Sequence, residues 1–270
     1  MRIVNLASGS KANCTFVSVN DTKILIDVGL SEKKLKAELE EIDEHLNEIN
    51  AVLITHEHID HIRSLKVLAK KYDIKFYLHK NLADSDFLND ISFKENALYK
   101  FVDEKFLIGD IEITPFDISH DAIAPVGFVA KAKGSKSKVA FLTDVGEIND
   151  KIKSVISGSK YVFLESNYDE NMLENGVYPR PVKDRIAGRF GHLSNKDSLE
   201  LAKYLYSTGT KCFVLSHLSE NNNTAELAYL NYVNFFKAQG LTLDKDVFVR
   251  LSFQHKHGNN FILKEEFDGK

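Results

Sequence analysis

Three imidazoles and the carboxylate of Asp60 fall within the six residues His56-Glu57-His58-Ile59-Asp60-His61. The apolar run at residues 51–55 (AVLIT) has the length and β-branched composition of a strand, and residues 59–72 carry apolar side chains at a helical period. The six residues therefore occupy a strand-to-helix junction. Imidazole and carboxylate suit zinc, manganese or iron, and no cysteine lies among them to indicate a thiolate site. The pattern predicts a metal site.

The spacing within this segment favours two neighbouring cations over one. His56 and His58 lie two residues apart on extended backbone, so both side chains can turn to one side. Asp60 and His61 fall at the start of the expected helix and face a second position. The alternative is a polar loop with chance histidines, and the flanking strand and helix argue against it.

An HxHxDH pattern after an apolar strand resembles the signature of the metallo-β-lactamase superfamily of metallohydrolases. The resemblance implies three further ligands, a His, an Asp and a His, each at the end of a later strand. Strand-like runs at residues 111–119, 139–143 and 212–216 are each followed by a residue of the required type. The resemblance implies that one metal is held by His56, His58 and His120. It implies that the other metal is held by Asp60, His61 and His217, and that Asp144 bridges the two.

The remaining histidines do not match this pattern. A single His after a strand is more often a structural residue, so His120 and His217 are favoured as ligands by their order along the chain. We interpret four others as surface or incidental residues: His45, His79, His255 and His257.

The overall pattern indicates one large α/β domain spanning residues 1–270, because folds with repeated βα units reach this length as one unit. Hydrophobic residues make up 43% and charged residues 27%, as in globular proteins. Strands outnumber a simple βα alternation, which suggests two sheets with helices outside. The resemblance implies an αββα sandwich of two mixed β-sheets flanked by helices. We expect strands near residues 2–6, 15–19, 24–28, 51–55, 126–132, 139–143, 161–165, 212–216 and 247–251 and around Phe76, Tyr99 and Ile111, and helices near 32–41, 59–72, 195–206 and 225–237.

We expect no targeting signal in this sequence. Residues 1–6 are followed at once by small and polar residues, and no apolar run is long enough to span a bilayer, so we expect a cytoplasmic protein. Two isolated cysteines, Cys14 and Cys212, indicate reduced and mostly buried thiols rather than a disulfide framework. The oligomeric state stays open.

Four further segments resemble the YycJ/WalJ-type branch of the superfamily: residues 6–13 (LASGSKAN), 164–169 (LESNYD), 191–195 (GHLSN) and 216–222 (SHLSENN). The resemblance implies a bacterial, metal-dependent phosphodiesterase that acts on DNA as a 5′ to 3′ exonuclease. Two metal ions would activate a bridging hydroxide, which Asp60 and Asp144 would orient. His192 would contact the phosphate or protonate the leaving oxygen. Its alternative role is that of a helix-entry residue ahead of a cap at Ser194 and Asn195.

DNA binding has only local support in the charge pattern. The formal net charge is −4, which counts against indiscriminate binding but not against a local groove. Residues 178–189 (YPRPVKDRIAGR) offer four cations against Asp184, and these are the candidate substrate contacts Arg180, Lys183, Arg185 and Arg189. An ordinary solvated helix face is the alternative. For the lysine-rich hairpin expected at residues 131–138, a solvated surface is favoured.

Three candidate substrate contacts near the start of the chain are Ser8, Ser10 and Asn13. The family pattern has a glycine where this chain has Ala12, which weakens the case for phosphate contact there. The ligand set does not separate zinc from manganese. A lactone or thioester hydrolase on the same metals is the alternative enzyme, and a structural or regulatory metal site is the non-enzymatic one.

Overall fold

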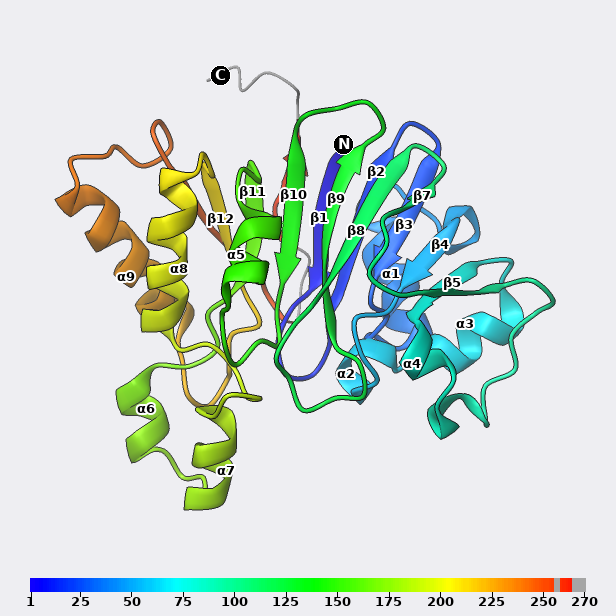
Figure 1. The fold of residues 1–270 in the computed structure, drawn as a ribbon, viewed down its shortest axis with the longest axis horizontal. Helices are drawn as coiled ribbons and strands as arrows, with labels where there is room; N and C mark the ends of the chain where they lie inside the picture. Colours follow the sequence, from blue (N-terminus) through cyan, green and yellow to red (C-terminus); the bar gives the residue numbers. More distant parts are fainter. Residues whose placement is uncertain (255–257, 264–270) are drawn as a thin grey trace.

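The computed structural model describes residues 1–254 and 258–263 of the chain. Two mixed β-sheets pack face to face, and helices cover the outer face of each (Figure 1). Buried apolar side chains form three groups, one between the sheets and one between each sheet and its helices. This arrangement confirms the predicted αββα sandwich.

The first sheet has, among the described residues, seven strands in the order β14-β1-β2-β3-β4-β5-β6. Neighbours are antiparallel from β14 to β3 and parallel from β3 to β6. The strands are β1 (Arg2–Ala7), β2 (Cys14–Val19), β3 (Thr22–Ile26), β4 (Ala51–Leu53), β5 (Lys75–His79), β6 (Leu98–Phe101) and β14 (Asn260–Ile262). The buried faces of α1 (Glu32–Glu40) and α3 (Leu65–Lys71) join the apolar core on its outer side.

The second sheet repeats this plan in the order β13-β12-β11-β10-β9-β8-β7. Neighbours are antiparallel from β7 to β10 and parallel from β10 to β13. The strands are β7 (Phe106–Ile108), β8 (Ile111–Asp117), β9 (Val126–Ala132), β10 (Lys138–Leu142), β11 (Tyr161–Glu165), β12 (Cys212–Ser216) and β13 (Phe248–Leu251). The covering helices are α5 (Asp150–Ile156), α8 (Asn195–Ser207) and α9 (Ala225–Ala238).

Central strands such as β12 are buried at every position, because one face packs on the other sheet and one on helices. Their sequences therefore read as continuous apolar runs. The predicted bounds of β9, β11 and β12 coincide with the observed ones.

Shorter elements connect the layers: α2 (Ile59–Ile62), α4 (Lys80–Ala83), α6 (Glu170–Asn175), α7 (Arg180–Ile186) and the 3-10 turns η1 (Leu46–Glu48) and η2 (Asp86–Leu88). The loops after β4, β10 and β12 run to the edge of the molecule where α2 and α7 lie (Figure 1). In sheets of this kind, ligands bind outside the carboxyl ends of the parallel strands. The β9–β10 hairpin, which forms as predicted, lies at the opposite edge.

The single helix expected over residues 59–72 is divided into α2 and α3. The His61 carbonyl accepts a hydrogen bond from the Val28 N–H, and both the N–H and the hydroxyl of Ser64 donate to the Val28 carbonyl. These bonds replace the helical ones at that point. The strand expected over residues 24–28 ends at Ile26, because Asp27 has a left-handed backbone with φ of 61°.

The histidines outside the proposed ligand set have different environments. His45 is exposed, as expected. His79 is not a surface residue: it is buried at the end of β5, and its Nδ1 accepts a hydrogen bond from the Asn81 N–H. His255 and His257 lie outside the described residues.

Cys14 and Cys212 are buried and unpaired, which confirms the expectation of free thiols. In the part of the chain that the structure describes, no helix combines the length and apolar character needed to cross a bilayer.

Candidate metal centre

The HEHIDH segment lies at a strand-to-helix junction, as predicted. Strand β4 ends at Leu53, His58 has an extended backbone just before α2, and α2 begins at Ile59. The His56 and His61 side chains are fully buried, and their ring centroids are 4.0 Å apart. His58, at the start of α2, places its ring centroid 4.6 Å from that of His56.

The later candidates converge on this segment from three other loops. Two groups of side chains each offer ligand atoms within 4.8 Å of one another: His56, His58 and His120; and Asp60, His61 and His217. Asp144 lies between the two groups. Its Oδ2 is 3.3 Å from His61 Nε2, and its Oδ1 is 3.8 Å from His120 Nε2 and 3.5 Å from His217 Nε2.

Hydrogen bonds behind the imidazoles fix which ring nitrogen faces the centre. His61 Nδ1 is 2.8 Å from Asp27 Oδ2, and His217 Nδ1 is 2.8 Å from Glu165 Oε1. His120 Nδ1 donates to the carbonyl of Gly191 at 3.2 Å. Each contact leaves Nε2 directed into the centre, as supporting carboxylates and carbonyls do around metal-ligating histidines.

The carboxylates make this space favourable for positive charge. Burial works against a charged His217, yet the neighbouring carboxylates of Asp144, Asp60 and Glu165 raise the pKa of His217 to about 10. Burial also opposes a charged His61, and Asp27 and Asp144 raise its pKa. The pKa of His56, by contrast, is lowered by burial and by the neighbouring imidazoles. A divalent cation beside Asp144 would supply the charge that the carboxylates favour.

Three buried atoms that face the centre have no hydrogen-bond partner within the described residues: His56 Nε2, His217 Nε2 and Asp144 Oδ2. Buried polar atoms normally have a partner. Imidazole nitrogens and carboxylate oxygens are ligands that zinc and manganese accept. The donor set therefore fits divalent metal.

Glu165, the last residue of β11, is fully buried and lies at the centre of the supporting contacts. Its two oxygens are within 3.2 Å of five nitrogens: the backbone N–H groups of Asp144, Val145 and Leu193, and Nδ1 of His192 and His217. Burial would raise the pKa of Glu165, but the two imidazoles and their hydrogen bonds lower it to about 2. Sequence analysis assigned Glu165 no role. The available signal was a carboxylate ending an apolar run, inside a segment already singled out.

His192 lies at the centre, although two residues later Ser194 caps α8 by accepting a hydrogen bond from the Asp197 N–H. Its Nδ1 is 2.9 Å from Glu165 Oε1, and its ring centroid is 5.2 Å from those of His120 and His217. The close approach of its loop depends on Gly146, where a Cβ would lie 2.4 Å from the Arg189 carbonyl oxygen.

The N-terminal loop supports the ligands from the other side. Ser8 is buried, and its hydroxyl accepts a hydrogen bond from the His217 N–H. Asn13 is buried too, with its amide nitrogen 3.1 Å from Asp60 Oδ2 and 3.0 Å from His61 Nε2. Ser10 is exposed in the same loop. Phosphate contact by these three residues stays a prediction.

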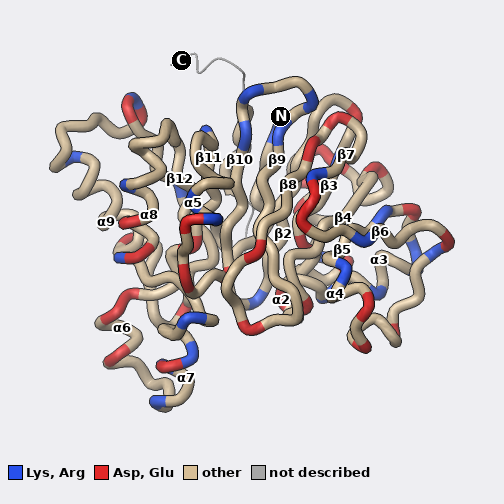
Figure 2. Tube along the Cα trace, viewed as in Figure 1, with Lys and Arg blue, Asp and Glu red and all other residues tan. Residues whose placement is uncertain are grey.

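The predicted basic segment forms α7 and the turn after it, and acidic residues lie on the neighbouring α6 (Figure 2). Arg185 connects it to the centre: its guanidinium is 2.5 Å and 2.6 Å from Asp121 Oδ2. Asp121 Oδ1 is in turn 3.5 Å from His120 Nε2. The other three cations also have partners, which are Glu174 and Asp184 for Arg180, the Glu174 carbonyl for Lys183, and Glu147 for Arg189.

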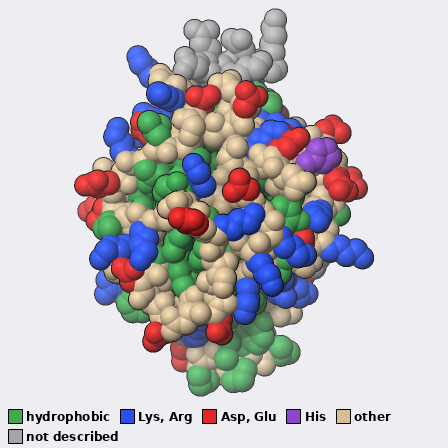
Figure 3. All heavy atoms as spheres, turned by 90° about the vertical axis from the view of Figure 1, so that its right-hand side faces the viewer, with side chains coloured by type: hydrophobic (Ala, Val, Ile, Leu, Met, Phe, Trp, Pro, Cys, Tyr) green, Lys and Arg blue, Asp and Glu red, His purple; other side chains and the backbone are tan. Residues whose placement is uncertain are grey.

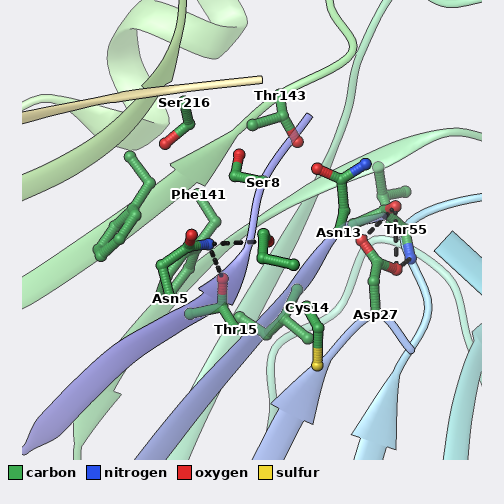
Figure 4. Close-up of a pocket in the computed structure, with 14 residues that line it drawn as sticks. Asn5, Ser8, Asn13, Cys14, Thr15, Asp27, Thr55, Phe141, Thr143 and Ser216 are labelled. Carbon is green, nitrogen blue, oxygen red and sulfur yellow. Dashed lines mark hydrogen bonds between the residues drawn. The ribbon is translucent and has the colours of Figure 1, made fainter. Parts of the chain in front are cut away.

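A polar cavity lies between the sheets beneath the centre (Figure 4). On one side Thr55 donates its N–H and hydroxyl to Asp27, which holds His61. On the other side lie Ser8, Thr143 and Ser216, which come from three different strand ends. The supporting contacts of the ligands thus continue into the space between the sheets.

Comparison with known proteins gives consistent results. A family model described as the β-lactamase superfamily domain matches residues 22–218. The chain is 35% identical over 237 residues to a Bacillus anthracis protein named exodeoxyribonuclease YycJ, covering 87% of this chain and 89% of the relative. It is 37% identical over 233 residues to exodeoxyribonuclease WalJ of Streptococcus pneumoniae, covering 85% and 86%. Among solved structures, the metallo-β-lactamase fold protein YhfI from Bacillus subtilis aligns with a TM-score of 0.70 over 97% of this chain and 99% of that one, at 14% identity, a likeness of fold alone.

Replacing Glu165→Gln should weaken metal binding about 10- to 100-fold, the usual effect of losing a supporting carboxylate. The substitution keeps the size of the side chain but turns one acceptor oxygen into an amide donor that faces N–H groups. Competition with a chelator would measure the dissociation constant of Mn²⁺ or Zn²⁺. Glu226→Gln, in the exposed first turn of α9, is the matched control. Equal affinity in Glu165→Gln and the unmodified protein would contradict the assignment.

Metal binding should release protons at neutral pH. His217, with a pKa raised to about 10, is protonated at pH 7, and ligation through Nε2 requires the neutral ring. Apparent affinity should therefore rise with pH, by up to about tenfold per pH unit for one released proton. Titration calorimetry of the chelator-treated protein, in buffers of different ionisation enthalpy, counts the protons. Heats that do not depend on the buffer would show that no proton leaves.

Proposed function

This chain belongs to the β-lactamase superfamily and is a metal-dependent nuclease, and on that premise we propose that it digests DNA from the 5′ end toward the 3′ end with two divalent metal ions. The two relatives that match most of the chain are named exodeoxyribonucleases. The observation that favours DNA over a small ester as the substrate is the ion pair between Arg185 and Asp121. This ion pair attaches the basic helix α7 beside His120. A pocket for a small ester would not need that helix.

In this proposal, one ion is held by His56, His58 and His120, the other by Asp60, His61 and His217, and Asp144 serves both. The position of Asp144 supports the shared role, because its carboxylate lies 3.8 Å from His120 in one group and 3.3 Å and 3.5 Å from His61 and His217 in the other. When bound, zinc or manganese lowers the pKa of water and neutralises charge on the phosphate oxygens.

The protein's own groups position water and move a proton. Asp60 and Asp144 accept hydrogen bonds from the attacking water and so orient it toward phosphorus. Glu165 accepts from His192 Nδ1–H, so a second proton carried on Nε2 faces away from Glu165. Transfer of that Nε2 proton to the leaving oxygen leaves His192 as the neutral ring. Glu165 also holds His217, so the same carboxylate aligns a ligand and the proton donor.

The cations of α7 and of the turn after it would bind the DNA backbone. Arg180, Arg185 and Arg189 are exposed, and exposed ion pairs are weak, so phosphate can compete with their acidic partners. Bacterial DNA is cytoplasmic, which agrees with the location expected from the sequence.

Digestion of end-labelled linear DNA tests the proposal. We expect nucleotide release that requires added Mn²⁺ or Zn²⁺, proceeds from the 5′ end, and is lost in Asp60→Ala and in His58→Ala, which remove ligands. Labels at the 5′ and at the 3′ end, in separate reactions, give the polarity. Intact DNA in reactions where the metal-loaded protein hydrolyses lactones or thioesters would refute the nuclease in favour of small-ester hydrolysis.

Replacing Arg185→Ala should chiefly weaken DNA binding and leave turnover at saturating DNA largely intact. Loss of one phosphate contact should lower the slope of log affinity against log salt by about 1. Arg250→Ala is the matched control. Arg250 is also in an ion pair, with Asp244 at 2.7 Å, but it lies on the edge strand β13 and not in the basic segment of α7. Equal salt slopes in all three proteins would show that Arg185 contacts no phosphate.

A further inference from the structure

Phe190 carries an exposed aromatic ring in the loop that leads to His192 at the candidate metal centre. Its exposed fraction is 56%, and it is the one phenylalanine among the large apolar side chains exposed in the described residues. A single exposed apolar side chain is ordinary on a protein surface. The position of this ring, the rigidity of its backbone and its neighbours are what indicate a role.

The backbone of Phe190 is fixed to the loop that carries His120. Three consecutive carbonyls, at residues 189–191, accept hydrogen bonds from Ser119 Oγ at 2.7 Å, from the Asp121 N–H at 3.2 Å and from His120 Nδ1 at 3.2 Å. Because the last of these donors is a proposed ligand, the backbone that carries the Phe190 ring is tied to the centre. Side chains that must meet a substrate at a defined place need such support.

A cation accompanies the ring. The Arg189 guanidinium carbon lies 5.7 Å from the centroid of the Phe190 ring. Arg185, four residues before Arg189, forms an ion pair with Asp121. Proteins that bind single-stranded nucleic acid combine aromatic rings, on which bases stack, with cations that follow the phosphates. Arg189 and Phe190 are adjacent in sequence and supply one group of each kind.

Two further apolar side chains are exposed in the loops that carry the candidate ligands. Ile59, next to His58, is 60% exposed, and Ile123, in the His120 loop, is 47% exposed. The Ile123 N–H donates to Glu57 Oε1 at 2.9 Å, which joins these two loops. Hydrophobic side chains also gather at the lower end of the molecule in Figure 3, the end at which α7 lies in Figure 1.

We propose that Phe190 is a stacking platform for an unpaired base that flanks the scissile phosphate, so that the substrate is a DNA end whose terminal nucleotides are single-stranded. A duplex keeps the faces of its bases stacked inside, whereas an unpaired nucleotide offers a face to the ring. The inference rests on the proposed nuclease function and adds to it the form of DNA that is accepted.

The test compares single-stranded oligonucleotides that differ by one base, with an abasic sugar placed at the first or at the second nucleotide. For the unmodified protein, removing the stacked base should raise KM about tenfold, in the range of base–aromatic stacking. Phe190→Ala should raise KM on normal DNA by a similar factor, with kcat within about twofold of the unmodified protein. Its KM on the abasic substrate should be no higher than its KM on normal DNA. Phe190→Trp should restore the low KM.

Tyr204→Ala is the matched control. Tyr204 is 39% exposed on α8, and Lys153 Nζ lies 5.7 Å from its ring centroid, so it repeats the ring-and-cation arrangement away from the proposed ligands. We expect no change in KM or kcat on either substrate.

The possible results separate the two proposals. If the unmodified protein releases nucleotides but Phe190→Ala has an unchanged KM, the stacking role is wrong and the nuclease stands. A kcat loss of equal size on normal and abasic DNA would place the effect in the His120 loop and would also overturn stacking. No release from any DNA by the metal-loaded protein would reject the nuclease itself. Docking of a partner protein on Phe190 predicts no dependence on the base.

Discussion

Buried negative charge is the constraint on which the centre depends. Glu165 and Asp144 are almost completely buried, and a buried carboxylate is tolerated only when it is paired and hydrogen-bonded. Glu165 is satisfied by five N–H donors from three loops, so its charge holds the loops after β10, β11 and β12 together with the turn before α8. Asp144 is balanced by His61 and His217, and metal binding adds to that balance. Charge, rather than apolar contact, fixes this edge of the sandwich.

The same constraint explains the backbone at the strand ends. Asp27, Asp144 and His217 have φ of 61°, 57° and 54°, a conformation that costs a non-glycine residue of order 1 to 3 kcal/mol. Each comes one or two residues after a strand, and the reversed φ takes its side chain out of the alternation that the strand imposes. Hydrogen bonds hold two of these turns, from the His217 N–H to Ser8 Oγ and from the Asp144 N–H to Glu165. Conformational strain at these positions is balanced by the contacts that assemble the centre.

Much of this arrangement could be predicted from the sequence, for physical reasons that differ between residues. Parallel strands such as β12 are covered on both faces, so an apolar run identifies them directly. The HEHIDH segment is recognisable because its ligands are adjacent in sequence. The sequence marks Glu165 only as a carboxylate that ends an apolar run, and its supporting role could not be predicted, because its five partners come from loops that only the fold brings together. The division between α2 and α3 depends likewise on Val28, more than thirty residues earlier.

An acidic chain that acts on DNA needs its positive charge in one place. Each proposed phosphate-binding cation of α7 and of the turn after it already has an oxygen partner in the protein. The net electrostatic attraction between these cations and the phosphates along a DNA duplex is therefore small. A phosphate that enters the centre would gain the stronger electrostatic attraction of the metal ions, because bound metal ions are the largest local charges in such a site. In the proposed nuclease, affinity would then be concentrated where the bond is cleaved, and the surface around it would add base stacking and one or two ion pairs. Such a distribution favours strand ends that can reach a buried centre over continuous duplex that cannot.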